Sequence, residues 1–388
     1  MANFDFYSAK AVLLRQRLQW IKDSWREANP AHNEIKLWIQ ERYDFFEPEI
    51  SRIERLIQRR NPAYLPRIKT IHSLLEQELL SVSNYIGIML REGSNETKMS
   101  KLIRRMCHES EFQVRDFLVT FTTLEGPAII IGQPFNPIFY VTDESLACPY
   151  SWIAFFHEIG HVVVRHNRED IIESLIRIVR DHFRQAKVAI GPIDDPSRQR
   201  QEAALDEAEK YWTEGKNYLR LVELFCDCFA AYACGLAYLY FWLDHGISFE
   251  EHPKDIDSRD EHPPFFARFE ACWHILPDTI KDSDSGANLK SLRRDYLSTS
   301  SQATNPELEY GTVCSRSLIC SLADAAVEQI QRLWSSLSQW SNPPTDNPQL
   351  KIEEPLASTL NTLVFLLLHD SASYPQLEKR ITQGILEK

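Results

Sequence analysis

Glycine is scarce in this sequence, with 12 residues in a chain of 388. Because tight turns often require glycine, its scarcity, together with long stretches rich in Leu, Ile, Glu and Arg, favours helices over a turn-rich β architecture. The composition is also unlike that of a disordered chain, since 44% of the residues are hydrophobic and 25% are charged. We therefore expect a folded and mainly helical protein.

Segments that would take the chain to or across a membrane are missing. The first residues, MANFDFYSAK, do not form a basic stretch followed by an apolar one, so they do not resemble a secretory signal. The most apolar run, Cys228 to Leu243, is shorter than the roughly 20 residues that a spanning helix needs and is typical of a buried helix. The sequence predicts a cytoplasmic protein without stable membrane insertion.

Basic residues are outnumbered by acidic ones, 43 to 55, which gives a formal net charge of −12. Proteins whose main work is to neutralise nucleic-acid phosphates are basic, so we expect no nucleic-acid partner. The eight cysteines are scattered along a large chain instead of being spaced as a small secreted disulfide framework. We therefore expect free thiols.

Breaks in the apolar pattern divide the chain into three regions, 1–125, 126–280 and 281–388. The first region carries apolar residues at helical spacing and is interrupted by helix-breaking residues, which predicts a bundle of about five helices. These interruptions lie at Pro30, Pro48, Pro62, Pro66 and Gly93. The last region is expected to be helical, with linkers at 282–286 and 341–348.

The middle region begins with two short apolar runs, 128–131 and 138–141, which are typical of strands. Beyond them the apolar spacing becomes helical again. Helices are expected over 150–164, 170–186, 198–213, 218–243, 263–275, 317–340 and 356–368. The fold class predicted from this pattern is mainly α with a small β element (α+β).

The motif His157-Glu158-Ile159-Gly160-His161 lies inside an apolar stretch that is long enough for a helix. On a helix, residues four apart stand on one face about one turn from each other, so both imidazoles can reach one tetrahedral zinc ion. Glu158 then lies beside the metal, where it can take a proton from zinc-bound water and later deliver it to a leaving amine. The alternative is that both histidines are packed on a core helix, although burying them without partners is costly.

A catalytic zinc needs a third protein ligand and an open position for water. Glu223 and Asp227 are also four residues apart, and they open a helix that is otherwise strongly apolar. Glu223 can complete a set of two histidines and one glutamate, while Asp227 accepts a hydrogen bond from the far nitrogen of a ligand imidazole. The alternative is that these acids mark the solvated start of a helix.

These motifs resemble those of a known family. The HEIGH sequence at 157–161, the stretch ELFCDCFA at 223–230, and His262-Pro-Pro followed by Arg268 are similar in order and rough spacing to the motifs of the gluzincin metallopeptidases. The similarity is greatest to the HtpX-type and CAAX-prenyl-protease group. It covers residues 150–275 and implies a zincin-like metallopeptidase core, which here would be flanked by helical bundles.

In that group the pattern implies zinc bound by His157, His161 and Glu223, with Glu158 catalytic and Asp227 orienting a ligand. The two short strands before the HEIGH helix are similar to the small sheet that borders the substrate cleft in zincin-type peptidases. Members of the group carry membrane-spanning helices, whereas this sequence has no run long enough for one. Membrane-embedded substrates are therefore not expected here.

By the same resemblance, His262 and Arg268 approach the cleft, where a His or Arg donor stabilises the oxyanion of a tetrahedral intermediate. The alternative is that the segment His262-Pro-Pro caps a helix and that Arg268 pairs with a nearby acid. Cys226 and Cys228 flank Asp227, but residues two apart on a helix point to different sides. We expect them to be small buried side chains and not metal ligands.

Together these features predict a zinc metallopeptidase, an endopeptidase more readily than an exopeptidase, that acts on a protein or peptide. Water on the zinc, deprotonated through Glu158, would attack a peptide carbonyl that the metal polarises. A regulatory protein partner could gate cleavage. The alternative is that the helical flanks form a protein-binding scaffold in which the zinc site is structural or vestigial.

Overall fold

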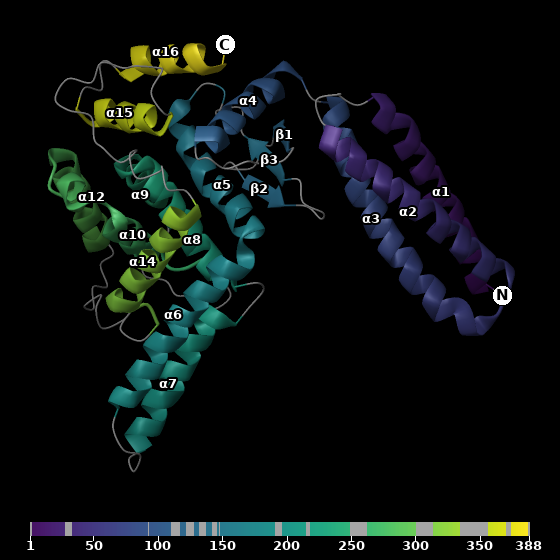
Figure 1. Cartoon of the computed structure of the whole chain (residues 1–388), viewed down its shortest axis with the longest axis horizontal. Helices are drawn as coiled ribbons and strands as arrows, with labels where there is room; N and C mark the ends of the chain where they lie inside the picture. Colours follow the sequence, from purple (N-terminus) through teal and green to yellow (C-terminus); the bar gives the residue numbers. More distant parts are fainter. Residues whose placement is uncertain are drawn as a thin grey trace. The chain divides into compact units, whose positions relative to one another are not determined.

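The computed structural model describes residues 2–27, 33–91, 93–109, 117–121, 128–131, 137–141, 146, 148–190, 196–214, 218–248, 262–299, 313–333, 356–369 and 374–386 (Figure 1). Within these ranges the chain is mostly helical and has one small sheet, which confirms the predicted fold class at this level. Two compact units are present: unit 1 is Met1–Lys101 with Val114–Thr142, and unit 2 is Leu102–Gln113 with Asp143–Lys388. The three regions expected from the sequence stay a prediction.

Unit 1 is built on three long helices, α1 (Ala2–Glu27), α2 (Asn33–Gln58) and α3 (Leu65–Arg91), which pack against one another. A 3-10 turn, η1 (Pro62–Tyr64), joins α2 to α3, and α4 (Ser94–Glu109) begins in unit 1 and continues into unit 2 from Leu102. Apolar residues at helical spacing meet in a single core that includes Leu14, Leu18, Ile39, Ile50, Leu75 and Leu79. The apolar periodicity of the sequence therefore corresponds to the buried faces of this bundle.

The break expected at Pro48 is wrong, because Pro48 lies inside α2. Proline removes one backbone hydrogen bond from a helix, and Pro48 lies on the exposed side, where water can bind the carbonyl that loses its partner. Phe46 and Ile50, on either side of it, are fully buried and hold the helix against the core. The described residues of the N-terminal region therefore form four α-helices and not five.

A three-stranded sheet also belongs to unit 1. Its strands are β1 (Leu118–Phe121), β2 (Ala128–Ile131) and β3 (Pro137–Val141), in the order β1-β3-β2. β3 pairs with β1 in parallel and with β2 in antiparallel orientation, and Leu118 lies opposite Ile138 in the core of the helical bundle. The two expected strands are confirmed, whereas the short run LVTF gave no signal for β1. That this sheet borders a substrate cleft stays a prediction.

The regular elements in the described residues of unit 2 are all helices. Its elements are η3 (Pro149–Trp152), α5 (Ile153–His166), α6 (Arg168–Ala189), α7 (Pro196–Thr213), α8 (Leu219–Cys234), α9 (Leu236–Ser248), α10 (Phe265–Ile275), α11 (Asp278–Lys281), α12 (Asp284–Thr299), α14 (Arg316–Leu333), α15 (Leu356–His369) and α16 (Tyr374–Leu386). Helix α8 packs against α5, α6, α9, α10, α14 and α15, so nearly all of its side chains are buried (Figure 1). It is the central helix of this unit.

The single helix expected over 218–243 is wrong, because the chain breaks at Gly235 between α8 and α9. Gly235 has a φ of 58°, a conformation that glycine adopts at no steric cost. The buried amide of Ala237, in the first turn of α9, donates to the side-chain oxygen of Asn361 in α15 at 3.1 Å. The break and this contact together set the direction in which α9 leaves α8.

The linker expected at 282–286 is also wrong, since α12 begins inside it at Asp284. A Cβ on Gly286 would lie 2.5 Å from the carbonyl oxygens of Ile280 and Lys281, so glycine permits a close backbone approach here and does not mark a flexible linker. The second expected linker, 341–348, and the expected helical residues 334–340 lie outside the described residues. In the described part of the chain, no helix has the length and apolar character needed to cross a membrane.

Candidate metal site

The HEIGH motif lies on α5, as the sequence predicts. Phe155, Phe156 and Ile159 are fully buried and anchor this helix in the core of unit 2. On the other face, the rings of His157 and His161 have centroids 4.9 Å apart. These two histidines and Glu158 each offer a ligand atom, and the three atoms lie within 4.8 Å of one another. Among the described residues they form a group that could hold a metal ion.

Gly160, inside the motif, allows α8 to approach α5 very closely. A Cβ at this position would lie 2.9 Å from the Cα of Cys226 and 3.1 Å from its sulfur. Cys226 and Cys228 are both fully buried, and all eight cysteines of the chain are free, as expected. Because α8 lies directly against the motif, a side chain one turn before Cys226 can reach the two imidazoles.

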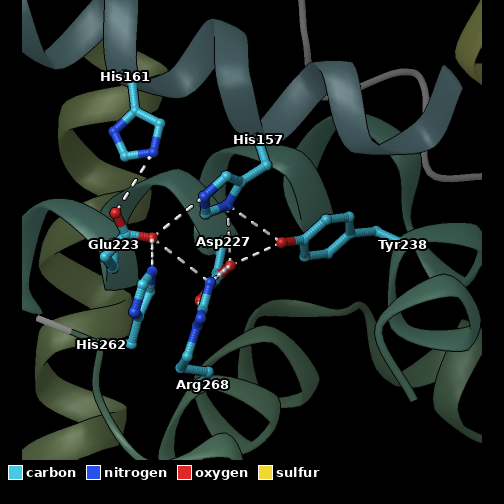
Figure 2. Close-up of polar contacts among 7 residues, drawn as sticks. All are labelled: His157, His161, Glu223, Asp227, Tyr238, His262 and Arg268. Atoms are coloured by element: carbon cyan, nitrogen blue, oxygen red, sulfur yellow. Dashed lines mark hydrogen bonds and ion pairs between the residues drawn. The ribbon is translucent and has the colours of Figure 1, made fainter. Parts of the chain in front are cut away.

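That side chain is Glu223, which joins the two histidines although it is distant in sequence (Figure 2). Its Oε2 lies 3.2 Å from Nε2 of His157, and its Oε1 lies 3.4 Å from Nε2 of His161. Glu223 is only 8% exposed, so the alternative of a solvated acid at a helix start does not describe it. The structure thus brings together the two imidazoles and the carboxylate that the sequence singled out.

Asp227 lies one turn further along α8 and is completely buried. Its Oδ1 lies 3.0 Å from Nδ1 of His157, on the side of the ring that faces away from Glu223. Nδ1 of His157 can therefore donate to Asp227, while Nε2 is on the side of the ring that faces Glu223 (Figure 2). This is the orienting contact expected from the sequence.

Arg268 on α10 lies behind the site and is 6% exposed. Its Nε and Nη2 donate to the two oxygens of Asp227, the latter at 2.9 Å, and its Nη2 lies 3.6 Å from Oε2 of Glu223. The guanidinium also stacks over the Trp242 ring at 4.1 Å from the centroid. Of the two interpretations given by the sequence, pairing with a nearby acid is the one that these contacts show.

His262 reaches the site from the segment just before α10. Its side chain is 51% exposed, and its Nε2 lies 3.6 Å from Oε2 of Glu223. The N-cap residue of α10 is Pro264, the last residue of this segment. The segment His262-Pro-Pro therefore does cap α10, as the alternative expected, and in addition it places the exposed imidazole of His262 at the edge of the site.

Tyr238 on α9 is a site residue that the sequence did not reveal. Its hydroxyl donates to Oδ1 of Asp227 at 2.6 Å and lies 3.2 Å from Nδ1 of His157. Tyr238 follows Asp227 by eleven positions, and in an unbroken helix this offset would separate the two residues by about 16 Å along the axis. The break at Gly235 turns α9 back toward α8, and that glycine within an apolar run was the only sequence signal available.

The electrostatic field of the site favours positive charge between the imidazoles and the acids. Burial opposes a charged His157, but its hydrogen bonds to Asp227 and Glu223 outweigh burial and raise its pKa to about 10. Burial and the neighbouring His157 lower the pKa of His161 to about 4. Although burial favours the neutral acid, contact with His157 lowers the pKa of Glu223 to about 2. A cation between these groups would be stabilised by the same carboxylates.

The spacing of the three side chains fits a tetrahedral zinc ion. Ligand atoms about 2.0–2.1 Å from a tetrahedral zinc lie about 3.3 Å from one another. The separations of 3.2 Å and 3.4 Å between the carboxylate of Glu223 and the two Nε2 atoms agree with this value, although each involves a different oxygen. Nitrogen and carboxylate donors are also the types that zinc accepts.

No family model matches this sequence, and neither a curated protein nor a solved structure is significantly similar to it. The resemblance to gluzincin metallopeptidases therefore rests on the sequence motifs and stays a prediction.

Proposed function

We propose that this chain is a zinc-dependent metallopeptidase of the gluzincin type, in which His157, His161 and Glu223 hold the metal. The observation that carries the proposal is the convergence of two imidazoles from one helix and a buried carboxylate from another, at 3.2 Å and 3.4 Å. The three residues occupy the positions of the metal ligands in the motifs that the sequence resembles. Their donor types and spacing suit zinc.

Two carboxylates compete for the third ligand position, because Glu158 also places an oxygen within 4.8 Å of the histidine nitrogens. We assign Glu223 as the ligand, since it contacts both imidazoles and its carboxylate also forms an ion pair with Arg268. Glu158 lies beside them on α5 and is partly exposed. As a residue that is not assigned as a ligand, it can exchange protons with a water molecule and with substrate.

When bound, zinc would supply a Lewis acid that polarises a carbonyl oxygen and lowers the pKa of water. Glu158 accepts the proton of the attacking water and returns it to the leaving amine. Asp227 holds His157 in the tautomer that presents Nε2 to the metal. Arg268 fixes Asp227 and Glu223, and the exposed His262 can donate a hydrogen bond to the developing oxyanion.

We infer a protein or peptide substrate and cleavage within the chain, because HExxH sites of this kind most often hydrolyse peptide bonds. The zincin-like core and the cytoplasmic location belong to the same proposal. The test begins with elemental analysis of the purified protein beside a His157→Ala variant. We expect stoichiometric zinc in the wild type and strongly reduced zinc in the variant.

Activity is tested by incubating the protein with a proteome extract and detecting new peptide termini. Glu158→Gln should retain zinc and abolish cleavage, because the amide side chain cannot accept the proton. Unchanged cleavage by this variant would remove Glu158 from the mechanism. A wild-type protein that holds zinc but generates no new termini would contradict the peptidase assignment.

A second candidate function is a helical protein-binding scaffold with a structural zinc. Two observations favour it: His262 is close enough to Glu223 to become a fourth ligand, and large apolar side chains are exposed on α1–α3, namely Leu13, Trp20, Leu37, Phe45 and Leu74. Zinc spectroscopy distinguishes the two functions, since a closed four-ligand site indicates a structural role. An open position that carries water indicates catalysis.

A further inference from the structure

We infer that Tyr238 is a positioning residue that fixes His157 in the orientation and tautomer needed for metal binding. This inference rests on the proposed function, because it assigns Tyr238 a role only if His157 is a ligand. Neither the sequence motifs nor the HExxH chemistry assigns a role to this tyrosine. It comes from α9, an element that contributes no proposed ligand (Figure 2).

The hydroxyl oxygen of Tyr238, Oδ1 of Asp227 and Nδ1 of His157 form a triangle of close contacts. The Tyr238 hydroxyl lies 2.6 Å from Oδ1 of Asp227 and 3.2 Å from Nδ1 of His157, and the same Oδ1 lies 3.0 Å from Nδ1. All three groups are largely shielded from solvent, with Tyr238 only 1% exposed and Asp227 fully buried. The hydrogen bonds of these atoms are therefore made to one another or to other protein groups.

The donors and acceptors in this triangle have one consistent arrangement. An ionised Asp227 only accepts, so the single hydroxyl proton of Tyr238 is donated to it. The hydroxyl oxygen then presents its lone pairs to Nδ1 of His157, beside the carboxylate oxygen. Every neighbour of Nδ1 in the triangle is thus an acceptor, which keeps a proton on Nδ1 and leaves Nε2, on the side of the ring that faces Glu223, as the nitrogen that can bind a metal.

Tyr238 reaches this position because of two contacts outside the site. Gly235 permits the sharp break after α8, and Asn361 from α15 accepts a hydrogen bond from the backbone of Ala237, next to Tyr238. The first turn of α9 is therefore fixed by the break that precedes it and by the hydrogen bond between Ala237 and Asn361. A residue held this firmly can restrict the orientation of the imidazole that it contacts.

The helix offers a matched control. Tyr240 is also on α9, is also buried, and donates one hydrogen bond at 2.8 Å, but its acceptor is the backbone carbonyl of Ser285, outside the site. Tyr238→Phe and Tyr240→Phe each remove one buried hydroxyl from the same helix. A purely structural effect should appear in both variants, whereas an effect on metal binding should appear only in the first.

The experiment measures the zinc dissociation constant of each folded variant by competition with a chromophoric chelator, and the melting temperature of the zinc-free protein. We expect Tyr238→Phe to weaken zinc binding by about 10- to 100-fold, the usual effect of losing a contact to a ligand. Tyr240→Phe should leave the dissociation constant unchanged. The melting temperatures of the two zinc-free variants should be similar.

A double-mutant cycle with Asp227→Asn then tests whether the hydroxyl acts through this triangle. On that background Tyr238→Phe should cause little further loss of affinity, because the two residues act on the same imidazole. Additive losses would contradict the inference, and so would a Tyr238→Phe variant that binds zinc as the wild type does. A Tyr238→Phe variant with wild-type zinc affinity would contradict only the role of Tyr238 and would leave the proposed function unaffected.

A measurement on the wild type decides the matter even if Tyr238→Phe does not fold. In zinc-loaded protein labelled with ¹⁵N-histidine, the Nδ1 of His157 should carry a proton and the Nε2 should not. A ring that is bare at Nδ1 would overturn the inference. A wild-type chain that takes up no zinc would overturn both this inference and the proposed function.

Discussion

The ion pair between Asp227 and Arg268 is closed to solvent, unlike the pair between Arg332 and Asp170, whose side chains are both exposed. A buried pair gains little net stability when it forms, but removing one partner leaves an uncompensated charge in a medium of low polarity. Here Asp227 would keep only His157 and Tyr238 as partners. Loss of Arg268 should therefore lower the free energy of unfolding of the protein as well as disturb the site.

We predict that Arg268→Leu lowers the free energy of unfolding of the zinc-free protein by about 3–5 kcal/mol, as expected for breaking a buried pair. The control is Arg332→Leu, because Arg332 pairs with Asp170 at 2.9 Å between two exposed side chains. Loss of that exposed pair should lower the free energy of unfolding by less than about 1 kcal/mol. Urea denaturation followed by circular dichroism measures both values, and similar losses in the two variants would contradict the prediction.

At the scale of single residues, the sequence was informative where spacing along one helix determines geometry. His157 and His161 share a face because they are four apart, and the same is true of Glu223 and Asp227. Tyr238 could not be predicted in this way. Its place in the site depends on a helix break and on a contact from α15, which are tertiary features.

At the scale of elements, the contact between α5 and α8 determines whether the ligands meet. Gly160 has no side chain, and a Cβ at this position would lie only 2.9 Å from the Cα of Cys226. Backbone atoms cannot yield as a flexible side chain can, so any larger residue must push the two helices apart. The separation would act directly on the distance between Glu223 and the imidazoles.

We predict that Gly160→Ala destabilises the protein by about 1–3 kcal/mol through overpacking and weakens zinc binding by at least tenfold. Gly93→Ala is the control, since a Cβ there would meet only the end of the Glu96 side chain, at 3.1 Å. It should leave zinc affinity unchanged. The measurements are the zinc dissociation constant and the urea midpoint, and a Gly160→Ala protein with wild-type zinc affinity would refute the proposed role of this contact.

A second contact between elements joins α1 to α2 in unit 1. Arg15 donates to Glu54 at 2.9 Å and 2.8 Å, to Ser51 at 2.8 Å, and also to Glu47. The hydrogen bond from Arg15 lowers the pKa of Glu54 below its usual value, although burial acts in the opposite direction. Glu54 therefore contributes stability above its unfolded-state pKa, and this contribution is lost as the pH falls.

We predict that Arg15→Met costs about 1 kcal/mol at pH 7 and less below about pH 4, where Glu54 becomes protonated in the unfolded chain and then in the folded one. Arg17→Met is the control, because Arg17 makes a weaker contact to Glu76 at 3.6 Å. Urea denaturation at several pH values tests this. An Arg15→Met penalty that is constant between pH 7 and pH 3 would contradict it.

The elements themselves were predictable to the extent that local signals governed them. Helices α5, α6, α7 and α10 agree with the apolar periodicity of the sequence. The errors came where burial overrode a local breaker, as at Pro48, or where a glycine served close packing, as at Gly286. Such effects depend on neighbours that are distant in sequence, so no local pattern could reveal them.

At the scale of the whole molecule, all of the proposed ligands and the residues that support them belong to unit 2, whereas the helical bundle and the sheet belong to unit 1. A ligand that binds only the folded state stabilises the part of the protein whose unfolding destroys its site. Zinc should therefore act on the two units unequally.

We predict that zinc at about 100 times its dissociation constant slows hydrogen exchange in α5, α8 and α10, with a gain of about 2.7 kcal/mol for openings that break the site. The amides of α1, α2 and α3 should exchange at unchanged rates. Hydrogen-exchange mass spectrometry with and without zinc provides the comparison. Equal protection across both units would show that they unfold together and would contradict the prediction.

The helical pair α6 and α7 lies in the sequence between the histidines on α5 and the carboxylate on α8, and Arg268 follows later still on α10. A growing polypeptide emerges from the ribosome amino end first, so its imidazoles are made well before the acid that completes the set. In the proposed site, the complete ligand set therefore exists only after Glu223 at the start of α8 has been translated. A nascent chain stalled before residue 223 would present the HEIGH helix without the third proposed ligand.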